Sequence, residues 1–368
     1  MNHRIVLCDR LATIIAVGYQ RLFPMKARSS TPLVSAGVSR LVAAAAALLL
    51  ATGNPAQAAS DTQWTALGHG PCGVVDGKAY CLNPLSPFAS PRLVGQQVVR
   101  VHGGESVVCG VTPNGEGVCG DASTSSDAVR VAEGASNIAG VFGSGAWCAS
   151  LLQRGALCGR IETLIDGAQL GAPPIGLPDA QRYVAVLGGL SSCALTDTGK
   201  ILCWGAGRAG LLGRGDSGDA TPTPIAGEHR YKSIAGGERV WCGLVDDGTV
   251  RCWGDGRSGV LGNPDSLDRC ATADGTGFEC AKTPRQVRFP SPASQIDVAP
   301  GGVCALLIDQ RVACRGSSQE ALVIEGLPRD ITEIGVGNLH GCARSATGDL
   351  WCWFLTSRRP VPQKVARP

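Results

Sequence analysis

Pairs of short apolar runs separated by a turn recur along the chain, and each run of a pair carries one cysteine. The clearest copy is SCALTDTGKILCWG, in which Cys193 and Cys203 lie ten residues apart around Asp197, Thr198 and Gly199. Apolar runs of this length that flank turn residues predict β-strands. A glycine just past the midpoint suits a three-residue loop that needs a positive φ. Each copy therefore predicts a β-hairpin.

The cysteines of each copy are predicted to form a disulfide within their own hairpin. Counted outward from the turn, they fall opposite each other at a non-hydrogen-bonded pair, where the two backbones approach closely. Six copies have a spacing of ten residues and one has a spacing of nine. The predicted pairs are Cys72–Cys81, Cys109–Cys119, Cys148–Cys158, Cys193–Cys203, Cys242–Cys252, Cys304–Cys314 and Cys342–Cys352. Zinc sites use tighter pairs such as C-x2-C, and this sequence contains none.

The turn residues support most of these hairpins. Glycine stands one residue past the midpoint at positions 115, 199, 248 and 348, and the shorter copy has Asp76 and Gly77 at its centre. An Asp-Gly pair favours a two-residue hairpin turn. The copies around Gln153 and Asp309 lack the glycine, so the sequence gives weaker support for a turn there.

A unit of about four short strands surrounds each hairpin. The first cysteines of successive hairpins lie 37 to 62 residues apart. A strand ending in glycine precedes each hairpin, as in IAGG at 234–237, and several of these strands follow a P-x-x-V/I segment, as in PTPI at 222–225. Seven such units predict an all-β, seven-bladed β-propeller of four-stranded blades. We expect the terminal segments 64–68 and 360–365 to pair within one blade and so close the ring.

The first 58 residues have the features of a secretory leader. Arg40 precedes an apolar run over 41–51, and Ala56, Gln57 and Ala58 form a small-x-small cleavage site. The run is too short to cross a bilayer. The alternatives are an uncleaved anchor and a true start at Met25. We expect cleavage to leave a single propeller over 61–368 that does not insert into a membrane.

Removal of the leader changes the charge and cysteine balance. The leader holds six of the 33 Lys and Arg residues and one of the 30 Asp and Glu residues, so 27 basic and 29 acidic residues remain. A net charge near zero gives no support for nucleic acid as a partner. Cys8 also lies in the leader, which leaves 16 of the 17 cysteines. An even number at fixed spacings predicts a disulfide framework in an oxidising, extracytoplasmic location: secreted, periplasmic or at the cell surface.

The longest spacing between hairpins contains an insertion over 263–283. It carries its own cysteine pair, Cys270 and Cys280, again ten residues apart. We predict a surface hairpin pinned by a disulfide, which is a suitable place for a binding site because the loop is ordered in advance. The candidate binding residues are Asp268, Arg269, Asp274, Phe278 and Glu279. Calcium is an alternative for the acidic residues, but the segment lacks the ladder of acids found in an EF-hand.

The order I-A-G-G, C-x-L, D-x-G-x-V-x-C-W-G, G-x-L-G, P-x-x-V resembles the regulator of chromosome condensation repeat, in an exported bacterial form. Residues 234–262 and 187–213 carry the resemblance best, and weaker copies cover most of 64–365. The family's frequent histidine two residues before the cysteine survives only as His340, for which we expect a packing role. The eukaryotic namesake promotes nucleotide exchange on a small nuclear GTPase and binds chromatin. An exported, cross-linked chain is not expected to share that role.

No motif for catalysis, a cofactor or a metal is recognised. Four histidines follow the leader, at 69, 102, 229 and 340, and none has a metal or nucleophile-elbow spacing. The G-x-G-x-x-G match at 205–210 is repeated at 254–259, which indicates a loop of the repeat rather than a nucleotide site. We therefore expect a monomeric, non-enzymatic scaffold that binds a protein or a surface glycan. The alternatives are a polysaccharide hydrolase or lyase with carboxylates at the channel mouth, and a structural envelope component.

Overall fold

The computed structural model describes residues 64–67, 72–82, 92–103, 107–121, 129–140, 146–152, 155–160, 177, 183–187, 191–215, 220–237, 239–262, 267–272, 275–316 and 320–366. The predicted leader lies outside these residues. The segment from Thr62 to Pro368 forms one compact unit. No helix among the residues of known placement is long and apolar enough to cross a membrane.

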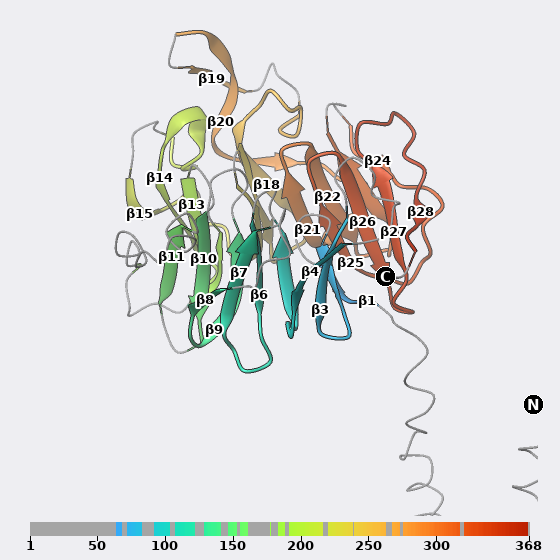
Figure 1. Cartoon of the computed structure of the whole chain (residues 1–368). Helices are drawn as coiled ribbons and strands as arrows, with labels where there is room; N and C mark the ends of the chain where they lie inside the picture. The colour runs from blue at the N-terminus through green and yellow to red at the C-terminus, as the bar shows by residue number, and fades with distance from the viewer. Residues whose placement is uncertain are drawn as a thin grey trace, which may run out of the picture. The chain divides into compact units, whose positions relative to one another are not determined.

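The unit is an all-β propeller built from antiparallel sheets whose strands follow one another in sequence (Figure 1). The first strands are β1 (Trp64–Leu67), β5 (Arg100–Gly103), β9 (Ala135–Gly140), β12 (Tyr183–Leu187), β16 (Tyr231–Gly236), β21 (Ala293–Ala299) and β25 (Ile331–Val336). The second strands are β2 (Cys72–Val75), β6 (Val107–Val111), β10 (Ala146–Leu151), β13 (Ser191–Thr196), β17 (Val240–Val245), β22 (Gly302–Leu307) and β26 (His340–Ser345).

The outer half of each sheet follows the same order. The third strands are β3 (Lys78–Cys81), β7 (Gly117–Asp121), β11 (Ala156–Arg160), β14 (Ile201–Gly205), β18 (Val250–Asp255), β23 (Val312–Arg315) and β27 (Leu350–Phe354). The fourth strands are β4 (Arg92–Gln96), β8 (Val129–Ala132), β15 (Ala220–Pro224), β20 (Gly277–Val287), β24 (Leu322–Val323) and β28 (Gln363–Lys364). The 3₁₀ turn η2 (Arg208–Gly210) follows β14, and β19 (Asp268–Ala271) pairs with β20.

The predicted number of complete blades is wrong for the described part of the chain. The structure shows six four-stranded blades rather than seven, and the β16–β20 blade among them carries β19 as a fifth strand. The remaining sheet, β9–β11, has three strands among the described residues. A fourth strand of this sheet would fall after Arg160, and residues 161–176 and 178–182 lie outside the part of known placement.

The predicted pairing of the two terminal strands is also wrong. β1 pairs with β2 in the first sheet, and β28 pairs with β27 in the last sheet. The P-x-x-V segments are fourth strands of the preceding blade, since β15 pairs with β14 and not with β16. Among the described strands, none is therefore left over to be exchanged between the ends. The first and last sheets are instead packed together, because β1 contacts β25 and β26.

The predicted disulfides are present in every hairpin. In the seven hairpins between second and third strands the two cysteines lie directly opposite each other, with Cα–Cα distances of 4.0 to 4.2 Å. The turns predicted from glycine have positive φ at Gly115, Gly199, Gly248 and Gly348. The hairpin without glycine around Asp309 turns as well, because Gln310 adopts a φ of 67°.

The turn glycines also join neighbouring blades. The Tyr231 amide donates to the Gly199 carbonyl oxygen (2.8 Å), and the Ala293 amide donates to the Gly248 carbonyl oxygen (2.9 Å). A Cβ atom at position 248 would lie 2.6 Å from the Cβ atom of Pro292. Each of these two positions therefore needs glycine both for its backbone conformation and for the close approach of the next blade.

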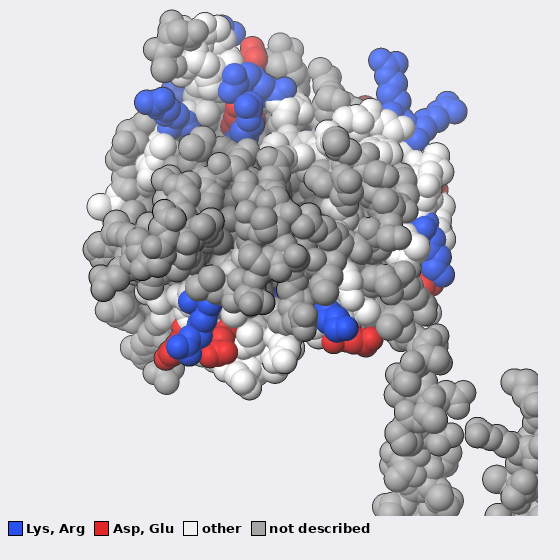
Figure 2. Space-filling view, viewed as in Figure 1, with Lys and Arg blue, Asp and Glu red and all other residues white. Residues whose placement is uncertain are grey.

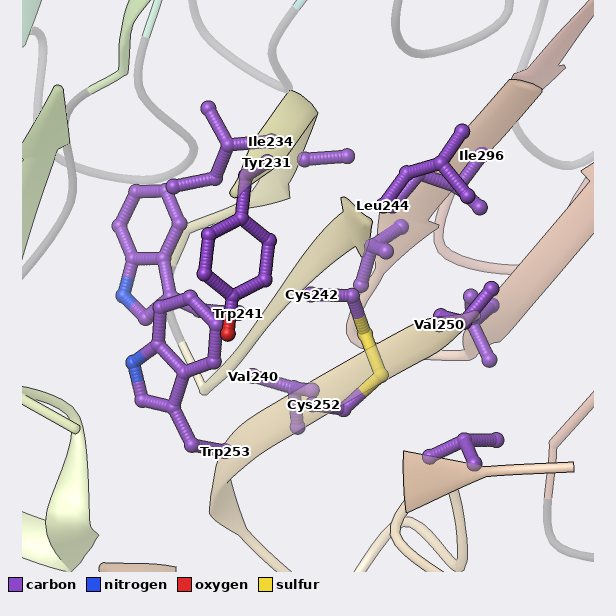
Figure 3. Packing of buried hydrophobic residues seen from close by; sticks show 14 of the residues in the cluster. Tyr231, Ile234, Val240, Trp241, Cys242, Leu244, Val250, Cys252, Trp253 and Ile296 are labelled. Carbon is purple, nitrogen blue, oxygen red and sulfur yellow. A yellow bond between two sulfur atoms is a disulfide. The ribbon is translucent and has the colours of Figure 1, made fainter. Parts of the chain in front are cut away.

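The largest hydrophobic cluster surrounds the Cys242–Cys252 disulfide (Figure 3). Trp241 and Trp253, the neighbours of these two cysteines, are fully buried. The Trp241 indole N–H donates to the Ser191 hydroxyl of the preceding blade (3.0 Å), and the Trp253 indole N–H donates to the Leu211 carbonyl oxygen (3.1 Å). Both rings thus hold adjacent blades together rather than serving as exposed binding platforms.

Candidate binding surface

The insertion forms a raised hairpin at one face of the propeller. β19 pairs with the first part of β20, and the later part of β20 is the fourth strand of its blade. Figure 1 shows this hairpin rising above the neighbouring sheets. The Cys270–Cys280 disulfide links its two strands. We call the face from which it rises the loop face, because it carries the connections between third and fourth strands. The opposite turn face carries the hairpin turns.

The base of the hairpin is fixed by a buried carboxylate. Asp255 at the end of β18 is buried and receives a two-pronged contact from Arg257, whose Nη2 lies 2.6 Å from Oδ2 and whose Nε lies 3.0 Å from Oδ1. These hydrogen bonds raise the pKa of the Arg257 guanidinium above its ordinary value. The same guanidinium lies 4.4 Å from the centre of the Phe278 ring. One arginine therefore connects the blade to the hairpin through an ion pair and a cation–π contact.

Backbone contacts at the base reinforce this attachment. The Gly256 amide donates to the Glu279 carbonyl oxygen (2.9 Å), and the Gly215 amide of the preceding blade donates to the Lys282 carbonyl oxygen (2.9 Å). A Cβ atom on Gly210 would lie 2.6 Å from the Ala281 carbonyl oxygen. Two connecting loops of adjacent blades are thus packed directly against β20.

Four of the five predicted binding residues are described, and they divide into two groups. Phe278 is buried beneath Arg257, and Asp268 faces inward, where it accepts hydrogen bonds from the Lys282 amide (3.0 Å) and from Nη2 of Arg285 (3.2 Å). Burial alone would raise the pKa of the Asp268 carboxyl, but these hydrogen bonds and the charge of Arg285 lower it below its ordinary value. These two residues hold the hairpin in place.

The outward group of the predicted residues consists of Arg269 and Glu279. Their side chains are 73% and 40% exposed and lie 3.4 Å apart, between Nη1 and Oε1. An exposed pair of this kind contributes little to stability, so both groups are available to a partner. Asp274, the fifth predicted residue, lies outside the described residues.

The anchoring residues Asp255, Arg257 and Arg239 were not predicted from the sequence. Arg239 adds a second, longer contact to the same carboxylate, with Nη1 3.5 Å from Oδ2. A signal for this cluster does exist. The segments GAGR at 205–208 and GDGR at 254–257 occupy the same place in their blades, and only the blade with the insertion has an acid at the second position.

The loop face around the hairpin carries mixed charge. The described residues of the connecting segments 205–220, 236–240 and 255–282 include six basic and three acidic side chains. Figure 2 shows basic side chains beside acidic ones in this region. Among the described residues, no group of three or more His, Cys, Asp and Glu side chains could hold a metal ion. The acids of the hairpin base are instead bound to arginines.

Two grooves lie between blades on the turn face. One, of about 380 Å³, is bordered by Lys200, Pro224 and Glu228, and the other, of about 410 Å³, is bordered by Asp247 and Phe289. Each groove contains one carboxylate in its lining. Hydrolysis of a glycosidic bond usually requires two carboxyl groups on either side of that bond.

His340 is a packing residue, as expected. Its side chain is 1% exposed, and burial lowers the pKa of its imidazole to about 4. Both ring nitrogens lack a hydrogen-bond partner among the residues of known placement. A neutral, enclosed ring of this kind does not present a proton donor or acceptor to a substrate.

No protein-family model matches the sequence, and no curated protein is significantly similar to it. Several solved structures are similar in fold. Human WBSCR16, an RCC1-like protein, is 17% identical over 83% of this chain and 92% of its own, with a TM-score of 0.57. Prp20p from Saccharomyces cerevisiae is 14% identical over 83% of this chain and 88% of its own, with a TM-score of 0.60. Yeast RCC1 (Prp20) bound to Kap60 is 14% identical over 82% of this chain and 81% of its own, with a TM-score of 0.59. At these identities the likeness shows an RCC1-like propeller fold alone.

Proposed function

We propose that this protein is an exported, non-enzymatic scaffold that binds a protein partner through the loop face, with the β19–β20 hairpin as the main contact. The observation that carries the proposal is the attachment of this hairpin. A disulfide, the Asp255–Arg257–Phe278 contacts and two backbone hydrogen bonds hold its base. A loop that is ordered before binding loses less conformational entropy when a partner docks.

Export is supported by the disulfides. Eight disulfides in one chain indicate an oxidising environment. Protein binding is in keeping with similar propellers. The structural report on Prp20p describes its binding properties to Gsp1p and histones, and RCC1 was solved bound to Kap60. These partners belong to those proteins, and we propose for this chain only the general activity of binding a protein.

The alternatives of a surface glycan as ligand and of a polysaccharide hydrolase or lyase have less support. Each of the two turn-face grooves has one carboxylate in its lining, whereas a glycoside hydrolase usually needs two carboxyl groups beside the bond that it cleaves. The loop-face acids of known placement at the hairpin base, Asp255 and Asp268, are bound to arginines.

Site-specific cross-linking tests the proposal. The oxidised protein with a photo-reactive benzoylphenylalanine at position 269, on the hairpin, should capture a partner from the native envelope or secretome. The same group at Arg329, an exposed residue on the turn face, should not. A second variant lacks residues 267–279 and carries Cys280→Ser. It should lose the partner while keeping the other seven disulfides. Equal capture from positions 269 and 329 would count against the hairpin as the contact.

A further inference from the structure

A pocket lies on the loop face between the β21–β24 blade and the β25–β28 blade, away from the hairpin. Its volume is about 280 Å³. The walls are apolar, because Leu322, Leu355, Pro360 and the disulfide-bonded Cys314 contribute them. Thr356, Ser357 and Arg358 of the connection between β27 and β28 form the polar part of the lining.

Positive charge is not balanced around this pocket. The loop-face segments 299–302, 315–322, 336–340 and 354–363 contain three arginines and one acid, Glu320. Glu320 interacts with Arg315, which is largely buried. Arg358 and Arg359 are exposed, and their guanidinium groups form no hydrogen bond or ion pair with the residues of known placement. Figure 2 shows basic side chains projecting from this corner of the molecule.

Exposed apolar side chains flank the loop that lines the pocket or lie in the connection bonded to it. Phe354 is 38% exposed and Val361 is 69% exposed, and they stand on either side of the loop that forms the pocket. Leu339, in the neighbouring connection, is 37% exposed, and its carbonyl oxygen accepts a hydrogen bond from the Leu355 amide (2.9 Å). An apolar pocket with exposed apolar neighbours and free arginines is typical of the centre of a protein interface.

We propose that this pocket recognises an acidic, apolar segment of a partner protein. One large apolar side chain of the segment enters the pocket, and a carboxylate beside it pairs with Arg358 or Arg359. The pocket volume lies at the small end of the roughly 300 to 1,000 Å³ range of small-molecule sites, and one large apolar side chain fits into it. The arginine fork matches a carboxylate in geometry and charge.

This inference rests on the proposed protein-binding function but uses a different part of the loop face. The test measures fluorescence anisotropy of the labelled peptide Ser-Asp-Asp-Leu-Phe-Asp-Ser with the oxidised protein. One control peptide has Asn in place of each Asp, and another has Ala in place of Leu and Phe. Both control peptides should bind at least about tenfold more weakly than the first.

Protein variants locate the binding. Thr356→Trp should fill the pocket mouth, and the double variant R358E/R359E should repel the peptide. Each should weaken binding at least about tenfold. The matched controls are Ala346→Trp and Arg329→Glu, at exposed positions on the turn face, and both should bind as the wild type does. Disulfide content by mass spectrometry confirms that each variant is folded.

The outcomes separate this inference from the proposed function. The inference is overturned if the acidic peptide does not bind, or if all four variants bind it as the wild type does. It is also overturned if decanoate, an anion with an apolar chain and no peptide, displaces the labelled peptide as effectively as unlabelled peptide does. If position 269 still captures a partner in that case, the scaffold proposal stands and only the pocket assignment fails. If the peptide binds as described and position 269 captures nothing, the hairpin is not the contact, and the pocket assignment stands.

Discussion

Two disulfide-linked hairpins within one blade have the same spacing of ten residues and different structures. In the β17–β18 hairpin, Cys242 lies directly opposite Cys252, with Cα atoms 4.0 Å apart, and both residues are fully buried. In the β19–β20 hairpin, Cys270 lies opposite Phe278 and its Cα atom is 5.9 Å from that of Cys280. Cys270 is partly exposed.

The difference comes from the turns. The Val245 amide donates to the Thr249 carbonyl oxygen, which centres the first turn midway between its cysteines. In the raised hairpin the Thr272 amide donates to the Thr276 carbonyl oxygen, one residue closer to the N-terminal cysteine than the midpoint. The second disulfide therefore joins residues that are diagonal neighbours. Equal spacing thus specifies which cysteines pair, while the turn decides the register and the burial of the bond.

The largest expected difference between the two hairpins is the loss of stability when the disulfide of each is removed. Cys242→Ala with Cys252→Ala should lower the free energy of unfolding by about 3 kcal/mol, because the denatured chain gains the entropy of an open loop. Cys270→Ala with Cys280→Ala should lower it by less than about 1 kcal/mol, because the raised hairpin can open without the blade. Urea unfolding followed by tryptophan fluorescence measures both values.

Limited reduction provides the control for this prediction. With increasing reductant and rapid alkylation, Cys270 and Cys280 should be modified before Cys242 and Cys252, because Cys242 and Cys252 are enclosed in the largest hydrophobic cluster. Equal losses of stability in the two double variants, or simultaneous alkylation of all four cysteines, would show that the hairpin and the blade unfold as one unit.

Acid should weaken the blades before it weakens the hairpin base. Burial lowers the pKa of His340 from an ordinary 6.5 to about 4, so between these pH values the unfolded chain binds a proton that the folded protein does not. The free energy of unfolding should therefore fall by about 3 kcal/mol as the pH drops from 6.5 to 4. His340→Leu should flatten this part of the profile, as measured by urea unfolding at several pH values.

The hairpin base responds in a lower pH range. The pKa of Asp268 lies below its ordinary 3.8, so its contribution is present above that pH and is lost only as the pH falls further. Arg285→Ala should lower the stability of the hairpin, as measured by the rate of Cys270 alkylation under mild reductant. The dependence of the free energy of unfolding on pH between 4 and 6.5 should stay as in the wild type. A changed slope would contradict the separation of the two regions.

Turn glycines should also differ between blade and hairpin. Gly248→Ala should lower the free energy of unfolding by about 2 kcal/mol, because a positive φ disfavours alanine and the new methyl group would meet Pro292. Gly275→Ala should cost at most about 1 kcal/mol, because Gly275 has a φ of 86° but no atom within 4 Å of the added Cβ. Thermal and urea unfolding of the two variants measure the difference.

The smallest effect is expected at a turn that lacks glycine. Gln310 has a φ of 67° and an exposed side chain. Gln310→Gly should raise the free energy of unfolding by about 0.5 kcal/mol, because relief of the left-handed strain exceeds the extra entropy of glycine in the unfolded chain. Asp309→Ala, which removes the ion pair with Arg311 (2.7 Å), serves as a destabilising comparison in the same turn. A loss of stability in the glycine variant would show that the strain is absent.

Local pattern determined the hairpins and their disulfides. Each turn and its two cysteines lie within about a dozen residues, so in the seven blade hairpins the spacing together with a centred turn places one cysteine opposite the other. The same reasoning predicted a pinned hairpin in the insertion, although it did not place Phe278 and Asp268 on the inward side. That placement depends on Arg257, which follows β18, and on Arg285, which lies in the part of β20 that belongs to the blade.

Only the tertiary structure decided which blade each P-x-x-V strand joins. A periodic sequence contains P-x-x-V segments between hairpins, and such a segment can join the blade before it or the blade after it. The structure places 220–224 beside β14 of the preceding blade, which is why the terminal strands do not exchange. The pocket between β23 and the β27–β28 connection has the same origin. It combines residues about 40 positions apart, and only the packing of one blade on the next brings them together.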